Sequence, residues 1–169
     1  MIDPLDRASR TVVAFLPAVV SVLLTLSACA PAVSTAQAPH GAEPVCASVV
    51  LALPDRLGAM ARLSTTSQAS AAWGTVAAPV VLRCGVTVPG PTVEHCVTVE
   101  TAGGPSIDWL AVAGHPDAQG STGWTFTTYG RDPAVEVRVP GAVASRRSTS
   151  FLDQLGPAIA RVKPIRACL

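Results

Sequence analysis

The stretch Ala134-Val135-Glu136-Val137-Arg138-Val139 alternates apolar and charged side chains with a period of two. This period is typical of a strand with one buried and one solvated face. Its three valines are therefore predicted to face a core, and its two charged side chains to face water. Such alternation is common in antiparallel sheets.

Further β-rich segments precede this one along the chain. They lie at residues 79–84 with an extension to Val88, 93–100, 107–112 and 124–129. Pro89-Gly90-Pro91 and Gly103-Gly104-Pro105 are typical of the turns between strands. Together these segments predict a meander of about five strands.

The two ends of this region have helical patterns instead. Residues 45–53 carry apolar side chains at helical spacing and are followed by Pro54. Residues 151–162 have one apolar helical face, which Gly156-Pro157 is expected to kink or to split into two short helices. We predict an α+β domain: an antiparallel β-meander of about five strands with N- and C-terminal helices packed on one face.

The N-terminal part has the features of an export signal. Residues 12–26 are uncharged and mostly apolar, and Leu26-Ser27-Ala28-Cys29 resembles a bacterial lipobox. The preceding ten residues are formally neutral, because Asp3 and Asp6 balance the two arginines. A secretory signal cleaved elsewhere and an uncleaved membrane anchor are the alternatives.

These patterns predict three regions and a location. Residues 1–28 are a lipoprotein signal peptide, residues 29–44 a lipidated Cys29 with an Ala/Pro-rich tether, and residues 45–169 one disulfide-stapled domain. The protein is then anchored by lipid at the extracytoplasmic face of the cell membrane. The formal net charge is only +1, so nucleic acid is not an expected partner.

The cysteine count predicts disulfides. Once Cys29 is assigned to lipid, Cys46, Cys84, Cys96 and Cys168 remain, an even set in an exported chain. Of three possible pairings we favour Cys84–Cys96, between neighbouring strands, and Cys46–Cys168, between the ends of the domain. No C-x-x-C spacing is present, and no metal or other cofactor is expected.

Motifs for nucleophilic or phosphate chemistry are missing from the sequence. Gly120-Ser121-Thr122-Gly123 does not have the spacing of a nucleophile elbow, and there is no S-x-x-K or glycine-rich phosphate loop. His95 is expected at the surface. His115 and Asp117 could orient a proton, although a turn stabilised by the aspartate is the simpler reading. No catalytic residue is assigned.

The candidate ligand-binding residues are Tyr129, Arg131 and Glu136. Arginine is suited to binding carboxylate or phosphate, and tyrosine offers a flat face beside it. The competing interpretation is an ion pair of Glu136 with Arg83 across the sheet, with Gly130 at positive φ. Trp73, Trp109 and Trp124 are expected in the core, with an exposed aromatic platform for glycan or peptide as the alternative.

Four motifs resemble those of a known family. They are Trp73-Gly74, Leu82-Arg83-Cys84-Gly85, Tyr129-Gly130-Arg131 and Val135-Glu136-Val137. From about Cys46 to the C-terminus, including Cys168-Leu169, the chain is similar to actinobacterial alanine-rich exported proteins and lipoproteins catalogued as a domain of unknown function. The resemblance implies a cell-envelope protein without an assigned reaction.

The expected function is therefore a non-catalytic binding or scaffold module for envelope proteins or cell-wall material. The alternative is an enzyme of envelope metabolism with a site near Arg131, Glu136 and Asp108. A metal or redox protein that uses its cysteines is a third hypothesis, which free thiols in the exported form would support.

Overall fold

The computed structural model describes residues 31–146 and 149–169. The predicted signal peptide and Cys29 lie outside the described residues. The strands are β1 (Arg56–Leu57), β2 (Met60–Leu63), β3 (Ser70–Thr75), β4 (Ala78–Val86), β5 (Cys96–Glu100), β6 (Ser106–Pro116), β7 (Thr122–Thr128) and β8 (Ala134–Val139). The helices are α1 (Pro44–Leu51), α2 (Gly141–Ala144), the 3-10 helix η1 (Thr149–Leu155) and α3 (Gly156–Ile159).

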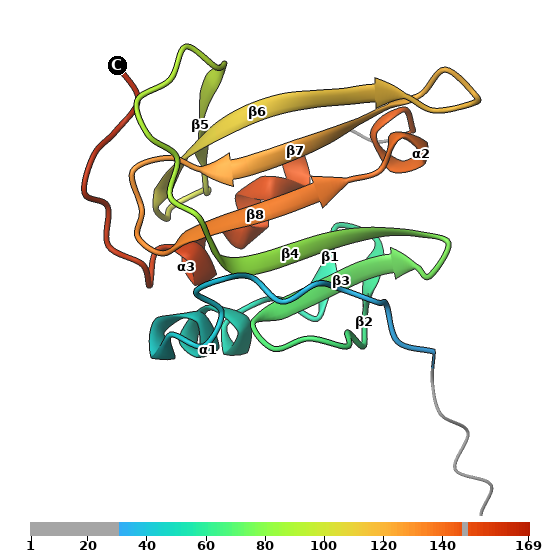
Figure 1. Cartoon of the computed structure of the whole chain (residues 1–169), viewed down its shortest axis with the longest axis horizontal. Coiled ribbons are helices and arrows are strands. Elements are labelled where there is room, and N and C mark those ends of the chain that lie inside the picture. The colour runs from blue at the N-terminus through green and yellow to red at the C-terminus, as the bar shows by residue number, and fades with distance from the viewer. Residues whose placement is uncertain (1–30, 147–148) are drawn as a thin grey trace, which may run out of the picture.

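The strands form one antiparallel sheet in the order β1-β2-β3-β4-β8-β7-β6-β5 (Figure 1). It consists of two successive meanders, β1–β4 and β5–β8, which are joined where Leu82 of β4 pairs with Val137 of β8. The predicted antiparallel sheet is confirmed, and it carries a few short helices. The predicted single meander of about five strands is wrong, because the chain after β4 crosses to the far edge of the sheet before β5 begins.

Strands β1, β2 and β3 are not predicted from the sequence. The stretch Ser70-Ala71-Ala72-Trp73-Gly74-Thr75 of β3 has small side chains and no apolar–polar alternation, so it carries little strand signal. Its first four residues are buried, because β3 lies between β2 and β4 and is covered on both faces. Tertiary pairing therefore makes this segment a strand.

The main core lies on the face of the sheet that carries the helices. Val135 and Val137 point into it as the alternation predicts, and both are fully buried. Trp73 and Trp109 are the largest fully buried side chains, which confirms their predicted core role. Trp124 is half-buried and stacks on Phe126 with ring centroids 6.2 Å apart.

The helices follow their predicted positions but are shorter. Helix α1 begins at Pro44, whose fixed φ suits a first helical turn, and ends before Pro54. The predicted C-terminal helix is divided at Gly156-Pro157 into η1 and α3. A proline inside a helix removes one backbone hydrogen bond and clashes with the preceding turn, which explains the division.

Part of the predicted tether is folded against the sheet. From Val33 onward the segment crosses the face opposite the helices (Figure 1). Val33 donates to the Ser64 carbonyl at 2.8 Å, and His40 donates to the Gly85 carbonyl at 2.8 Å. Val33 and Ala38 are buried. The solvated tether predicted up to residue 44 therefore does not extend beyond Val33.

The disulfide pairing is Cys46–Cys84 and Cys96–Cys168. All four cysteines are paired, but the expected partners are wrong. Cys84 lies in β4 and Cys96 in β5, at the far edge of the sheet, so they are too far apart for a bond. Cys46–Cys84 instead holds α1 on the core face, and Cys96–Cys168 holds the C-terminal end on the opposite face.

Candidate functional site

The turn after β7 holds the C-terminal segment, defined here as residues 163–169. Ile165 donates its backbone N–H to the Gly130 carbonyl at 2.7 Å, and Arg131 forms an antiparallel bridge with Pro164. The Arg166 guanidinium lies over the Tyr129 ring, 5.9 Å from its centroid, in range of a cation–π interaction. The predicted binding turn is therefore mainly an attachment point for another part of the chain.

Arg131 is buried and acts within this attachment. Only 6% of its surface is exposed, and its Nη1 donates to the Val162 carbonyl. Burial lowers the pKa of the guanidinium from its ordinary value, while the charge of Asp108 acts in the opposite direction. Its accessible surface is too small for it to be the ligand-binding arginine that the sequence suggested.

Gly130 is required by the close approach of the C-terminal segment. Its φ is +66°, a conformation that side chains with a Cβ rarely adopt. A Cβ at this position would also overlap the Arg166 carbonyl. The positive φ predicted for Gly130 is confirmed, and its reason is contact with residues far along the chain.

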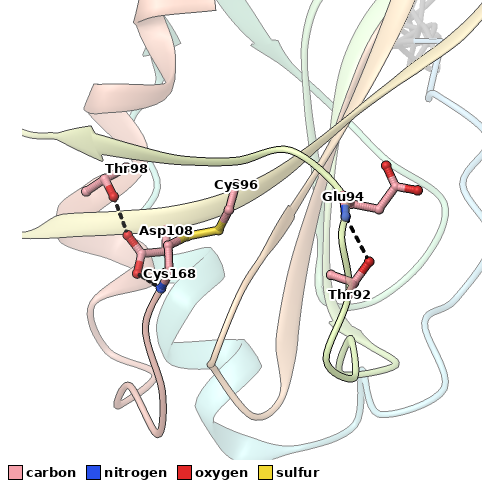
Figure 2. The surroundings of a disulfide bond; sticks show 6 residues. All are labelled: Thr92, Glu94, Cys96, Thr98, Asp108 and Cys168. Atoms are coloured by element: carbon pink, nitrogen blue, oxygen red, sulfur yellow. Dashed lines mark hydrogen bonds between the residues drawn. A yellow bond between two sulfur atoms is a disulfide. The ribbon is translucent and has the colours of Figure 1, made fainter.

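Asp108 of β6 attaches the end of the C-terminal segment (Figure 2). One carboxylate oxygen accepts from the Thr98 hydroxyl at 2.7 Å, and the other accepts from the Cys168 N–H at 2.9 Å. The adjacent Cys96–Cys168 disulfide fixes the same region covalently. Both oxygens of Asp108 thus have a structural partner, which argues against a role as a catalytic acid.

A surface cavity of about 730 Å³ lies beneath the C-terminal segment. Residues 91–96 form one wall and residues 166–169 the other, with Leu110 and Tyr129 between them. The cavity thus contains the Arg166 guanidinium, an aromatic ring and apolar side chains, with the Glu94 carboxylate on the facing wall. This composition suits a ligand with apolar parts and with an anionic group that contacts the Arg166 side. We call it the C-terminal cavity.

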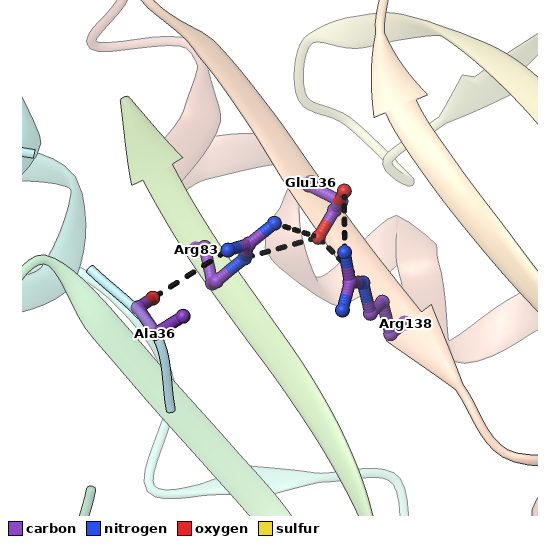
Figure 3. Close-up of polar contacts among 4 residues, drawn as sticks. All are labelled: Ala36, Arg83, Glu136 and Arg138. Atoms are coloured by element: carbon purple, nitrogen blue, oxygen red, sulfur yellow. Dashed lines mark hydrogen bonds and ion pairs between the residues drawn. The ribbon is translucent and has the colours of Figure 1, made fainter. Parts of the chain in front are cut away.

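Glu136 lies away from this cavity, on the open face of the sheet (Figure 3). Its carboxylate lies 2.8 Å from Arg83 Nη2 and 2.8 Å from Arg138 Nε. Arg83 also donates to the Ala36 carbonyl of the N-terminal segment at 3.5 Å. The ion pair across the sheet is the interpretation that the structure confirms for Glu136.

The three predicted ligand-binding residues are therefore not brought together. Tyr129 lines the C-terminal cavity, Arg131 is buried beside it, and Glu136 is held by arginines two strands away from Asp108. Arg166, the cationic group of the cavity, is not among the residues predicted from the sequence. The signal was Cys168, since a paired cysteine near the end of the chain implies that its neighbours are fixed on the domain.

The other polar candidates have ordinary roles. Asp117 accepts from the backbone N–H groups of Gln119 and Ser121 at 3.0 and 2.8 Å, which confirms the turn interpretation. His115 is exposed at the end of β6. His95 is exposed, as expected, and lines the C-terminal cavity.

Residues 31–146 and 149–169 contain neither a candidate metal site nor a membrane-spanning helix. No group of three or more His, Cys, Asp or Glu side chains in this part could hold a metal ion. None of its helices has the length and apolar character needed to cross a membrane.

The comparison with protein families gives a match over almost the whole chain. The family described as "Protein of unknown function (DUF3515)" matches residues 8–168. The chain belongs to this family. No curated protein and no solved structure is significantly similar to it.

The structure explains the role of two of the motifs by which this DUF3515 member resembles its family. In Leu82-Arg83-Cys84-Gly85, the cysteine bonds to α1, and a Cβ on Gly85 would overlap the backbone of His40 and Gly41. In Tyr129-Gly130-Arg131, all three residues contact or approach the C-terminal end of the chain. These two motifs hold the N- and C-terminal segments on the sheet.

Proposed function

We propose that this protein is a lipid-anchored, non-catalytic binding module at the outer face of the cytoplasmic membrane, with the C-terminal cavity as its binding site. Its ligands are envelope proteins or cell-wall material. The lipobox at Cys29 and the disulfides support an exported, anchored protein, because disulfides persist mainly outside the cytosol.

The composition of the cavity is the observation that carries the binding proposal. Arg166 has no carboxylate partner within salt-bridge distance among the described residues, so its charge is available to an anionic group. No hydroxyl or thiol lining the described cavity lies within hydrogen-bond distance of His95 or a carboxylate side chain. The cavity thus has groups for recognition but lacks an activated nucleophile.

The fold also supports an orientation relative to the membrane. Val33 lies against the sheet, only four residues after Cys29. An extended chain of four residues spans about 14 Å. The described chain begins at one end of the molecule and finishes at the opposite end (Figure 1). A lipidated Cys29 would hold the first end close to the bilayer and leave the C-terminal cavity facing away from it.

Cys29→Ser tests the anchor. Serine cannot accept the thioether-linked lipid. A lipid anchor contributes about 0.8 kcal/mol of membrane-binding free energy per buried methylene. We therefore expect the variant to leave the membrane fraction. Fractionation of cells that produce the full-length chain, followed by immunoblotting, measures this. The control is Ser27→Ala, which keeps the cysteine and a small residue two positions before it. Equal membrane retention of Cys29→Ser and the parent would contradict lipid anchoring.

Arg166→Gln tests the binding site. The variant keeps a side chain of similar length but loses the charge. We expect the affinity for cell-wall fragments or detergent-solubilised envelope proteins to fall about tenfold or more, because one charge-assisted hydrogen bond is lost. Co-sedimentation with purified walls and capture from the solubilised membrane fraction measure it.

The matched control for this experiment is Arg161→Gln. Arg161 is also exposed near the C-terminus but does not line the C-terminal cavity. Its variant should bind as the parent does. If Arg166→Gln and Arg161→Gln retain equal binding, the cavity is not the binding site.

A further inference from the structure

The two edges of the sheet differ in what they offer to another strand. At one edge lies β1, which has only two residues, and very short edge strands are one of the ways in which proteins prevent sheet-to-sheet pairing. At the other edge lies β5, with five residues of sequence Cys-Val-Thr-Val-Glu. It contains no lysine or proline, and its pairing with β6 shows no bulge, so among the usual protective features of an edge this strand has only the charge of Glu100.

The register of β5 defines which backbone groups are free. The Ala111 N–H donates to the His95 carbonyl, and the Thr101 N–H donates to the Pro105 carbonyl. The backbone N–H and C=O groups of the odd-numbered residues of this strand therefore point toward β6. In an antiparallel ladder the intervening residues direct both backbone groups away from the partner strand. The N–H and C=O groups of Cys96, Thr98 and Glu100 therefore point outward, with no hydrogen-bond partner among the residues that the structure describes.

We propose that β5 pairs antiparallel with β5 of a second copy of this chain, with Thr98 on the two-fold axis. Thr98 then faces the partner's Thr98, and Cys96 faces the partner's Glu100. Each of these is a hydrogen-bonded pair that uses the outward groups, and each contributes two backbone hydrogen bonds. The two sheets join into one continuous antiparallel sheet.

The side chains of β5 match such a partner on both faces. On the core face, the half-buried Val97 and Val99 meet the partner's Val99 and Val97, so apolar side chains cover apolar side chains. On the open face, Glu100 lies opposite a disulfide-bonded cysteine and has no like charge facing it. The two copies of Glu100 are separated by four residues along the strand direction, about 14 Å, at which distance their repulsion is largely screened.

Thr98→Cys tests this arrangement. Residues that form a hydrogen-bonded antiparallel pair have Cα atoms about 5.5 Å apart with side chains on the same face, which is within the range of a disulfide. Membranes from cells that produce the full-length variant are treated with a mild oxidant or a short bis-maleimide. We expect most of the chain to run at the mass of a homodimer on a denaturing gel, under non-reducing conditions for the oxidised sample.

Thr87→Cys is the matched control, because Thr87 is also an exposed threonine but lies between β4 and β5. It should give little homodimer. Equal dimer yield from both variants, or no dimer from Thr98→Cys, would overturn the proposal. An adduct of Thr98→Cys at another mass, without homodimer, would also overturn it and identify a different protein as the partner of β5.

A second pair of variants separates the backbone from the side chain. Thr98→Pro removes the outward N–H, which proline can lack at an edge strand without breaking a bond within the sheet. Thr98→Val removes only the hydroxyl contact with Asp108. Analytical ultracentrifugation of the detergent-solubilised protein should show dimers for the parent and Thr98→Val and monomers for Thr98→Pro. A monomeric parent, or a dimeric Thr98→Pro with unchanged affinity, contradicts β5 pairing.

Discussion

Replacing Cys46 and Cys84 together by alanine is expected to lower the free energy of unfolding by about 4 kcal/mol. The two cysteines are 38 residues apart and completely buried. Their bond restricts the unfolded chain, and the loop-entropy model assigns a loop of this length a stabilisation of that size. In the native state the same bond holds α1 against β4. Urea denaturation followed by tryptophan fluorescence measures the effect.

The second disulfide provides the comparison. Replacement of Cys96 and Cys168 by alanine opens a longer loop, of 72 residues, but these cysteines are half-buried and hold only the C-terminal segment. This variant should also be less stable, and it should lose the wall or protein binding that Arg166 supports. The Cys46/Cys84 variant should keep that binding wherever it remains folded. A parent-like urea midpoint for Cys46/Cys84 would contradict the prediction.

Trp73→Ala is expected to lower the free energy of unfolding by about 3–5 kcal/mol. The indole is fully buried, so its removal leaves a large cavity in the core, and its N–H donates to the Pro54 carbonyl at 3.0 Å. That hydrogen bond connects β3 with the chain between α1 and β1. Chemical denaturation again measures the change.

The matched comparison for Trp73 uses two conservative variants. Trp73→Phe removes the hydrogen bond to Pro54, whereas the equally buried Trp109 has an indole N–H without a partner in the described part of the protein. Trp109→Phe therefore breaks no hydrogen bond and removes a buried unpaired donor. We expect Trp73→Phe to be more destabilising by about 1–3 kcal/mol. A larger loss for Trp109→Phe would show that shape, and not the hydrogen bond, dominates at these positions.

Local patterns in the sequence were sufficient for some elements. The alternation over residues 134–139 correctly predicted which side chains of β8 face the core. The helical spacing ended by Pro54 and the break at Gly156-Pro157 located the short helices. These signals depend only on the period of the backbone and on the missing N–H of proline, so neighbouring residues are enough to express them.

Other parts of the fold depended on distant residues. Strand β3 is rich in alanine and serine and becomes a strand through its pairing with β2 and β4. Residues 33–41 look like a solvated linker, yet Val33 and Ala38 are buried on the sheet. In both cases the stabilising contacts come from segments far along the chain. Local propensity does not predict such contacts, because they form only in the tertiary structure.

The candidate site shows the same division. Tyr129, Arg131 and Glu136 are predicted to bind a ligand because their chemistry suits it. In the structure Arg131 holds the C-terminal segment, and Glu136 pairs with Arg83 and Arg138. Arg166 is not predicted from the sequence, because the nearby Cys168 indicates only that this segment is fixed on the domain and not where it lies. Arg166 becomes part of a cavity only because the Cys96–Cys168 bond holds the last residues of the chain over Leu110 and Tyr129.

By itself, the sequence determined an antiparallel sheet with short helices, an even set of four cysteines and a family of unknown function. Only the tertiary structure decided that β4 lies beside β8, that Cys84 bonds to Cys46, and that β5 is left as an open edge. Residue period reports which face of a strand is buried, and cysteine parity reports that bonds form. The burial of one common core decides which strands and cysteines become neighbours. The free energy of that burial depends on apolar side chains from the whole chain, so no local pattern reveals it.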